Sequence, residues 1–377
     1  MGNASFHVKP LKPIGSSKGK SGFFMDNSES QQQPLRKRID AIDACKLIAA
    51  LFVVGIHTAP LDSLSESANF TLFECFSRFA VPFYFASSSF FFFRGGVDEK
   101  KLWHYERRMG ILYGIWFLIA FPVTFARKYW VLFTQHELPV AIWRTVRGFL
   151  FASSFRGSWF LSGSMFCALV IFYLSKKLKT KHIMWICSAS YVFCVLCSTY
   201  GNLIYRIGLG EQYETLLFYF AHPYTSIITG LLYFAIGKYF AEHELEASAK
   251  DPKKYFLLSA ITMAGVMLEY TVAQRMGWVN STDCCFMLIP NVYCLLTFAL
   301  SSSIHLKHVK EIRASGVIVF FAHFSVLYAF QMMDKYLGLH IDTLTRYLLI
   351  LLISFSFAHF VLRMEDRKHW RWMHYLH

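Results

Sequence analysis

The sequence predicts an all-α protein that crosses a membrane many times, and three observations carry this prediction. Of its 377 residues, 55% are hydrophobic and 16% are charged, which is too apolar for a soluble globular protein. The mean hydropathy is positive. Apolar stretches long enough to cross a bilayer as helices recur along the chain after residue 38. We therefore expect a polytopic integral membrane protein.

Composition divides the chain into three parts. Residues 1–38 are polar and lack sustained periodicity, which predicts a disordered, solvated cytoplasmic tail rather than a cleaved signal peptide. Residues 39–363 are expected to form one transmembrane domain, and residues 364–377 a basic cytoplasmic tail. About ten helical spans are expected, near residues 39–60, 71–93, 109–133, 158–174, 183–200, 222–241, 255–273, 283–304, 314–333 and 343–362.

Lysine and arginine are distributed unevenly between alternate loops. If the N-terminal tail is cytoplasmic, the loops on its side carry 27 of the 38 lysines and arginines, while the opposite loops carry 9. The remaining two, Lys46 and Arg78, lie inside spans. Because cytoplasmic loops are enriched in these residues, we expect both termini to be cytoplasmic.

The connection 127–157 is the exception, because it is assigned to the outer side yet carries five of the nine basic residues there. The segment from Leu138 to Ala152 is amphipathic, with Arg144 and Arg147 on one side, and predicts a re-entrant or interfacial helix. Two interpretations of these charges remain open: an anionic outer ligand, or arginines that snorkel at the membrane surface.

The first span carries three ionisable residues, Asp43, Lys46 and His57. Lys46 and His57 are eleven residues apart, which leaves them about 20° from alignment on one helix face with a rise of roughly 16 Å. Asp43 lies one turn before Lys46, close enough to neutralise it. Ionisable groups inside a membrane are costly, so this face predicts a functional polar path.

The second span carries Arg78 among phenylalanines, followed by Pro82 and a run of serines. Arg78 needs a counter-ion or a water-filled cavity, and Glu74, one turn earlier, is the near partner. Pro82 frees a backbone carbonyl that serine hydroxyls can satisfy, so we expect this helix to be kinked or locally unwound beside the first.

Several functional classes find no support. The nine cysteines lie in apolar segments without the histidine spacing of a zinc site, so we expect buried thiols and no metal. No Gly-rich phosphate loop, nucleophile elbow or nucleic-acid module is present. The formal charge of +14 is accounted for by cytoplasmic loops, and no nucleic-acid partner is expected.

The first two spans resemble those of the acyltransferase-3 family of integral membrane acyltransferases. Asp43-Ala-Cys-Lys46, followed after ten intervening residues by His57, is similar to the D-x-x-R and distal histidine of that family, with Lys46 in place of the usual arginine. The segment from Arg78 to Ser88 is similar to its Arg-x-x-Val-Pro-x-Phe-Phe-x-x-Ser-Gly pattern, with Ser89 replacing the glycine.

Later segments resemble the family more loosely. They are the basic stretch containing Arg107 and Arg108, Trp159 at the start of a span, the glycines of residues 230–237, and His323. The arginines suit the phosphates of a coenzyme A donor but are also ordinary loop charges. Trp159 suits a site or an interfacial anchor, the glycines permit close helix contact, and His323 suits the site or a structural hydrogen bond.

The resemblance implies a multi-pass enzyme of the cell membrane, expected to be the bacterial inner membrane. It would move an acyl group, expected to be acetyl, from acyl-CoA to a hydroxyl of an envelope polysaccharide or glycolipid. His57 would be the general base, Lys46 would hold the donor or stabilise developing negative charge, and Asp43 would complete the catalytic set. Arg78, Ser88, Arg107, Arg108, Trp159 and His323 are the candidate substrate-binding residues. No tightly bound cofactor is expected.

Two other functional classes remain. A transporter or flippase for an envelope glycan would also need a polar path with charges and kinked helices. Such a protein should show internal repeats, and none is clear between residues 39–200 and 201–362. A sensor or scaffold would leave the aligned charges without a use.

Overall fold

The computed structural model describes residues 39–377, so the tail predicted for residues 1–38 lies outside the described residues. This part of the chain is helical and contains no strand. The α-helices are α1 (Asp40–Thr58), α2 (Glu66–Asn69), α3 (Ala80–Phe93), α4 (Glu99–Thr124), α5 (Trp130–Gln135), α6 (Leu138–Phe151), α7 (Trp159–Ser175), α8 (Thr180–Cys197), α9 (Gly201–Arg206), α10 (Gly210–Phe220), α11 (Leu231–Glu242), α12 (Glu244–Ser248), α13 (Pro252–Arg275), α14 (Leu288–Ser301), α15 (Val309–Leu337) and α16 (Thr343–Met364).

The all-α fold and its membrane character are confirmed. Within the described residues, six helical segments are long and apolar enough to cross a membrane: α1, α4 continued through α5, α8, α13, α15 and α16. Four other predicted spans are occupied by the shorter helices α3, α7, α11 and α14. The chain is therefore a multi-pass membrane protein, while the number of ten spans and the cytoplasmic placement of the termini stay predictions.

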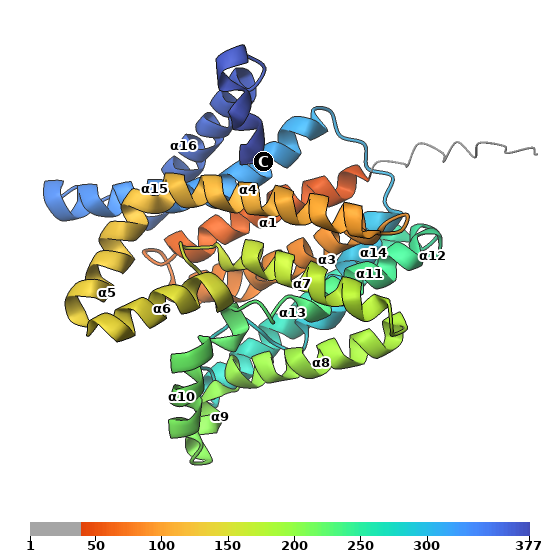
Figure 1. Cartoon of the computed structure of the whole chain (residues 1–377), viewed down its shortest axis with the longest axis horizontal. Helices are drawn as coiled ribbons and strands as arrows, with labels where there is room; N and C mark the ends of the chain where they lie inside the picture. The colour runs from red at the N-terminus through yellow and green to blue at the C-terminus, as the bar shows by residue number, and fades with distance from the viewer. Residues whose placement is uncertain (1–38) are drawn as a thin grey trace, which may run out of the picture. The chain divides into compact units, whose positions relative to one another are not determined.

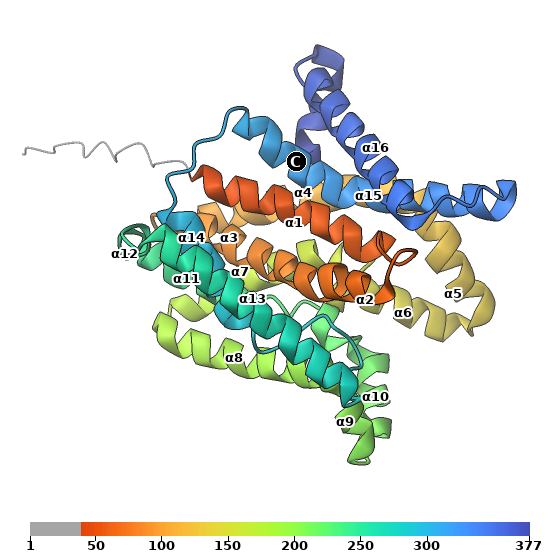
Figure 2. The same ribbon diagram turned by 180° about the vertical axis from the view of Figure 1, so that it is seen from behind.

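Most of the long helices run between the two ends of the bundle, α16 crosses them obliquely, and short helices gather at the two ends (Figures 1 and 2). The C-terminal end of α1 lies at the same end as α2, α5, α6, α9 and α10, and we call this the His57 end. The opposite end holds the start of α1 together with α12, and we call it the Lys46 end.

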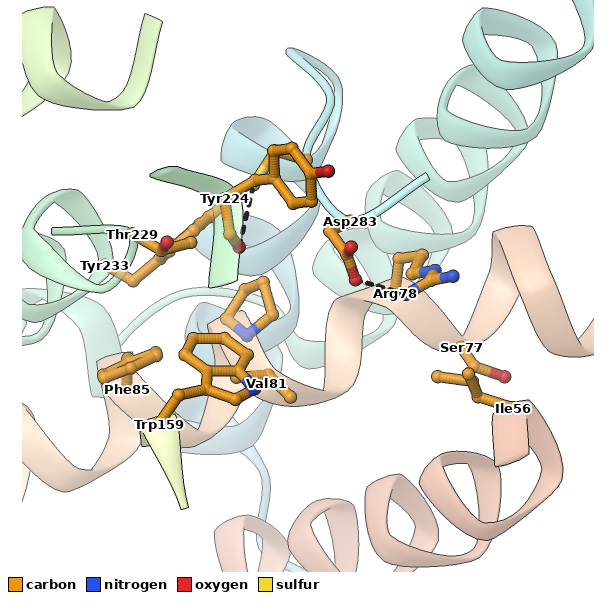
Figure 3. Close-up of a pocket in the computed structure, with 12 residues that line it drawn as sticks. Ile56, Ser77, Arg78, Val81, Phe85, Trp159, Tyr224, Thr229, Tyr233 and Asp283 are labelled. Atoms are coloured by element: carbon orange, nitrogen blue, oxygen red, sulfur yellow. Dashed lines mark hydrogen bonds and ion pairs between the residues drawn. The ribbon is translucent and has the colours of Figure 1, made fainter. Parts of the chain in front are cut away.

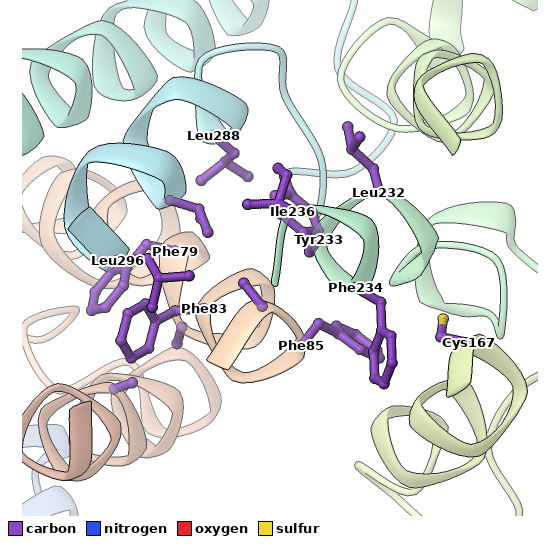
Figure 4. Close-up of a cluster of buried hydrophobic side chains, with 14 of the residues drawn as sticks. Phe79, Phe83, Phe85, Cys167, Leu232, Tyr233, Phe234, Ile236, Leu288 and Leu296 are labelled. Carbon is purple, nitrogen blue, oxygen red and sulfur yellow. The ribbon is translucent and has the colours of Figure 1, made fainter. Parts of the chain in front are cut away.

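The centre of the bundle is the contact between α3 and α11, where aromatic and aliphatic side chains interdigitate (Figure 4). The predicted close contact at the 230–237 glycines is confirmed. A Cβ atom on Gly237 would lie 2.1 Å from the carbonyl oxygen of Ala86, and one on Gly230 would lie 2.4 Å from the ring of Phe85. These glycines let the two helices approach until backbone and side chain touch.

We expect Gly237→Ala to destabilise the protein by about 1–3 kcal/mol, because the added methyl group meets backbone atoms that cannot move aside. The measurement is thermal unfolding of the detergent-purified protein. Gly114→Ala in α4 is the matched control, since nothing lies within 4 Å of the added Cβ there. Equal melting temperatures for the two variants would contradict the tight contact.

The second span is irregular where it approaches α1, as predicted. A π-helix (Phe70–Cys75) runs into a 3₁₀-helix (Phe76–Phe79), and only then does the regular helix α3 begin. The hydroxyl of Ser77 donates to the carbonyl of Leu72 at 3.2 Å, five residues back. The irregular turns therefore precede Pro82, and Ser77, rather than the serines after Pro82, satisfies a carbonyl there.

The helix predicted within Leu138 to Ala152 is present as α6. The apolar side chains Leu138, Ile142 and Leu150 are exposed on it. On another side, Arg147 donates to the carbonyls of Leu217 and Phe218 in α10. The amphipathic pattern is therefore confirmed, and insertion of this helix into the membrane stays a prediction.

The basic C-terminal segment folds back onto the bundle. A 3₁₀-helix (Lys368–Leu376) contacts α4, α15 and α16, and the indole of Trp116 in α4 donates to the carbonyl of Leu376 at 3.2 Å. Met373 and Leu376 are buried in this contact. The segment therefore packs against the bundle.

Candidate active site

Two histidines from different helices face each other at the His57 end of the bundle. His57 lies in the last turn of α1, and His323 lies in the middle of α15. Their rings are stacked, with centroids 5.6 Å apart and planes 17° apart. The ring of Phe324 contacts both, at 4.8 Å from His57 and 3.9 Å from His323. The packing of α1 against α15 thus brings together two residues that are 266 positions apart.

Hydrogen bonding fixes the state of the His323 ring. Its Nδ1 lies 3.1 Å from the carbonyl oxygen of Val319, one turn earlier. A carbonyl oxygen only accepts, so Nδ1 carries the proton and Nε2 of the neutral ring has a free lone pair. His323 is fully buried, and Nε2 has no hydrogen-bond partner in the described chain. A buried unpaired acceptor is costly and therefore points to a missing donor at this place, such as a substrate hydroxyl.

Lys46 lies on α1 about 16 Å from His57 by helix rise. Its ammonium group lies 5.5 Å from the centroid of the Phe91 ring in α3. The hydroxyl of Tyr84, also in α3, donates to the backbone carbonyl of Lys46 at 2.8 Å. Ser88 shares this face of α3, because it is four residues after Tyr84 and three before Phe91. The candidate Ser88 therefore lies toward Lys46 and away from His57.

Asp43 has a cationic partner that the sequence did not indicate. Its Oδ1 lies 3.4 Å from Nε of Arg313 in α15. We predicted that Asp43 neutralises Lys46. Arg313 is a second cation that interacts with the same carboxylate. Arg108 is a further cation whose charge reaches Lys46. The Lys46 end of α1 therefore gathers several positive charges around the carboxylate of Asp43.

Arg107 and Arg108 are exposed on the first half of α4. Neither makes a described ion pair, so both are available to a ligand at this end. Within the same turns, Tyr105 Oη and Glu106 Oε1 are buried without a hydrogen-bond partner. These polar groups mark the start of α4 as a second place where a ligand could bind.

Arg78 is held by α13–α14 loop residues and not by the carboxylate of Glu74. Its guanidinium donates to Asp283 Oδ1 at 2.6 Å (Figure 3). It also donates to Thr282 Oγ1 at 2.6 Å. Its Nε donates to the backbone carbonyl of Glu74 at 2.8 Å. The prediction that Glu74 supplies the counter-ion is wrong, because the irregular turns before α3 turn Arg78 toward the loop that precedes α14.

Trp159 and Arg78 line the same small cavity of about 40 Å³. Ile56, the neighbour of His57, also lines it, together with Asp283 (Figure 3). Trp159 is the first residue of α7, and its ring lies 5.9 Å from that of Phe85. The structure therefore joins two of the sequence-predicted binding residues, Arg78 and Trp159, beside the end of α1 that carries His57.

Three residues next to the candidate site residues were not indicated by the sequence: Asp283, Arg313 and Phe324. Asp283 and Arg313 lie at loop and helix ends, where charged residues are ordinary. Phe324 is one phenylalanine among 39. Its immediate neighbour His323 was the available signal, because a residue beside a site histidine on a helix lines the same region.

One group within residues 39–377 has the composition of a metal site. The ligand atoms of Glu365, His374 and His377 lie within 4.8 Å of one another. Glu365 is already bound by His377 Nε2 at 2.7 Å and by Lys310 Nζ at 3.2 Å. Burial would raise the pKa of Glu365, but the hydrogen bonds from His377 and Lys310 outweigh it and hold the pKa below its ordinary value. We therefore assign this cluster to docking the C-terminal segment.

This chain is similar to a known protein family and to several longer proteins. The model of a family described as an acyltransferase domain matches residues 39–363. An "Amino-acid racemase" of Enterococcus faecalis is 25% identical over 69% of this chain and 35% of its own length, and a second one is 21% identical over 88% and 47%. A "Serine/alanine racemase" of Enterococcus gallinarum is 20% identical over 86% and 46%. The chain thus matches about a third to a half of the length of these relatives. No solved structure matches.

Proposed function

Because this chain belongs to the acyltransferase-3 family, we propose that it transfers an acyl group from a cytoplasmic acyl-CoA to a hydroxyl group of an envelope glycan or glycolipid. The observation that carries the proposal is the pair of His57 and His323 at one end of α1, with Lys46 and its neighbouring cations at the other. The acyl group that we favour is acetyl, and the membrane is the bacterial inner membrane.

The two histidines have different roles in the proposed reaction. His57 makes no hydrogen bond to a described side chain, so a ring nitrogen is available to accept the proton of the acceptor hydroxyl. The hydroxyl oxygen attacks the thioester carbonyl carbon, the carbon–sulfur bond breaks, and the His57 imidazolium returns its proton to the departing thiolate. The ring of His323 stacks on that of His57, and its Nε2, which has no hydrogen-bond partner, would position the acceptor by accepting a hydrogen bond.

The cations at the Lys46 end suit the donor. Lys46, Arg108 and Arg313 place positive charge where the phosphates of coenzyme A would arrive, and charge-assisted hydrogen bonds to phosphate are strong. The thioester would then pass along α1 for about 16 Å to reach His57. Irregular backbone in the π and 3₁₀ turns before α3 lies beside this path, as expected where a membrane protein lines a cavity.

The orientation rests on the lysine and arginine bias, which places the Lys46 end in the cytoplasm. We expect a cysteine introduced into the 175–182 loop to resist a membrane-impermeant maleimide in intact cells and to react after permeabilisation. A cysteine in the loop between α9 and α10 should show the opposite behaviour. Labelling of the 175–182 loop in intact cells would reverse the orientation and move the donor to the His57 end.

The proposed reaction is tested by giving detergent-purified protein radiolabelled acetyl-CoA together with envelope fractions. Label should move to a glycan or glycolipid, and other acyl-CoA donors should define the acyl group. Release of labelled acetate without labelling of a glycan or glycolipid would mean that the protein hydrolyses acetyl-CoA. Movement of an unlabelled glycan across vesicles without any transfer of label would favour a transporter instead. The relatives whose names say racemase are more than twice as long as the region that this chain matches.

Lys46 provides a test of the donor site. Lys46→Met should abolish acyl transfer, because it removes the positive charge that would hold the donor next to Asp43 and Arg313. Lys46→Arg, which restores the residue usual in the family, should keep activity. The readout is the rate at rising acetyl-CoA concentration with protein level matched by immunoblot. Unchanged activity in Lys46→Met would remove this residue from the donor site.

A further inference from the structure

A large hollow adjoins the histidine pair at the His57 end. One cavity of about 360 Å³ lies between the C-terminal turns of α4, the 152–158 loop and α15. A second cavity of about 440 Å³ continues from it toward α6 and the loop after α10. Arg127, Lys128 and Ser153 line both, so the two cavities adjoin, and we call them together the basic groove.

The charge of the basic groove has one sign. No aspartate or glutamate is among the described residues that line either cavity. The basic and imidazole side chains that line them are Arg127, Lys128, His136, Arg144, Arg147, Arg156 and His222. Charged groups gathered in a concave surface at a membrane, all of one sign, attract a ligand of the opposite sign.

The groove cations are held by neutral groups. Arg127 donates to Gln331 Oε1 at 2.7 Å, and Lys128 donates to the carbonyl of Ser153. Arg147 bonds to backbone carbonyls of α10, and its Nε is buried without a hydrogen-bond partner. In the part of the chain that the structure describes, none of these three has a carboxylate partner within 4 Å. Their positive charge is therefore not neutralised by the protein.

Phe324 connects the groove to the catalytic pair. Its ring lines the first cavity, contacts both histidines, and lies 5.7 Å from the guanidinium of Arg156. The loop reaches this ring because Gly157 has a φ of +84°, and a Cβ atom there would lie 2.7 Å from Phe324. Glycine adopts a positive φ without steric cost, and this turn places Arg156 against the Phe324 ring, which also contacts His57.

We propose that the basic groove binds an anionic group of the acceptor, a phosphate or a carboxylate one sugar unit away from the hydroxyl that His57 deprotonates. The inference rests on the proposed function, because it takes the acceptor hydroxyl to lie at His57. Arginine binds both anions through two parallel hydrogen bonds, and a groove of this volume holds a sugar with its charged substituent. The donor phosphates are assigned elsewhere, because Lys46, Arg108 and Arg313 lie at the other end of α1.

The test measures binding without turnover. Detergent-purified full-length protein is titrated with N-acetylglucosamine 1-phosphate, with glucuronate and with uncharged N-acetylglucosamine, and the affinities are compared. At least one of the two anions should bind ~10-fold or more tightly than the neutral sugar, and its affinity should fall with added salt. The two anionic arms distinguish a phosphate from a carboxylate.

Arg156→Gln is the informative variant. Arg156 makes no hydrogen bond within residues 39–377, so its loss should leave the fold intact, while the preference for the anion should fall ~10-fold. Lys335→Gln is the control, because Lys335 is an exposed cation at the end of α15 that does not line the groove. Equal affinity for charged and neutral sugars, or an equal loss in the two variants, would overturn the proposal.

Two further outcomes separate other sources of the anion. If nanodiscs of anionic phosphatidylglycerol abolish sugar binding while phosphatidylcholine nanodiscs do not, the groove holds lipid headgroups and the proposal fails. If Arg156→Gln raises the KM for acetyl-CoA and leaves the acceptor KM unchanged, the groove belongs to the donor. If the protein binds the anionic sugar but transfers no label from acyl-CoA, the proposal that the basic groove binds an anion stands, and the proposed reaction is overturned.

Discussion

Replacing His57 by glutamine should lower acyl transfer by ~10²–10⁴-fold, which is the usual contribution of a positioned general base. Glutamine keeps hydrogen-bonding capacity but cannot accept a proton, so this substitution separates a base from a structural tether. His57 makes ring contacts with His323 and Phe324 and no hydrogen bond to a described side chain. The variant should therefore reach the membrane at the normal level. The measurement is label transfer from acetyl-CoA at matched protein amounts.

His323→Gln is the matched control on the facing helix. His323 is proposed to position the acceptor, so its replacement should raise the KM for the acceptor more than it lowers kcat. His57→Gln should lower kcat with little change in either KM. A His57→Gln variant with normal kcat, or a His323→Gln variant with the larger loss of kcat, would move the base to His323. Full activity in both variants would contradict the mechanism.

The sequence was most informative at ionisable residues inside apolar spans. Asp43, Lys46 and His57 are costly inside an apolar span, so their presence on one helix could be recognised from spacing alone. His323 was recognised for the same reason, and the structure brings it to His57 through the contact of α1 with α15. The membrane character of the chain also followed from hydropathy, because a bilayer requires long apolar segments, and six helical segments of the described chain have this property.

Partners that come from distant loops could not be predicted. Glu74 was favoured for Arg78 because it lies one helical turn away, but that inference assumes regular helix geometry. The π-helix and 3₁₀-helix around Arg78 break this register, and Asp283, 205 residues away, takes the ion pair. Arg313 reaches Asp43 in the same manner from α15. Such pairs depend on how helices pack, which local spacing does not determine.

The ion pair between Arg78 and Asp283 allows the second large prediction. Arg78→Met should destabilise the protein by about 2 kcal/mol, between the ~1 kcal/mol of an exposed pair and the ~3–5 kcal/mol of a fully buried one. The intermediate value is chosen because the two side chains are 16% and 27% exposed. Asp283→Leu should have a similar effect, since it leaves the guanidinium without its carboxylate. Thermal unfolding in detergent measures both changes.

The double variant Arg78→Met/Asp283→Leu decides between structure and substrate binding. Because it removes both charges, it should be more stable than the sum of the single effects predicts, by about 1–2 kcal/mol. If the pair only ties the second span to the loop before α14, acyl transfer should return with stability. If Arg78 also binds substrate in the cavity that it shares with Trp159, activity should stay low in the stable double variant. We expect the second result, and strictly additive destabilisation would show that the two charges do not interact.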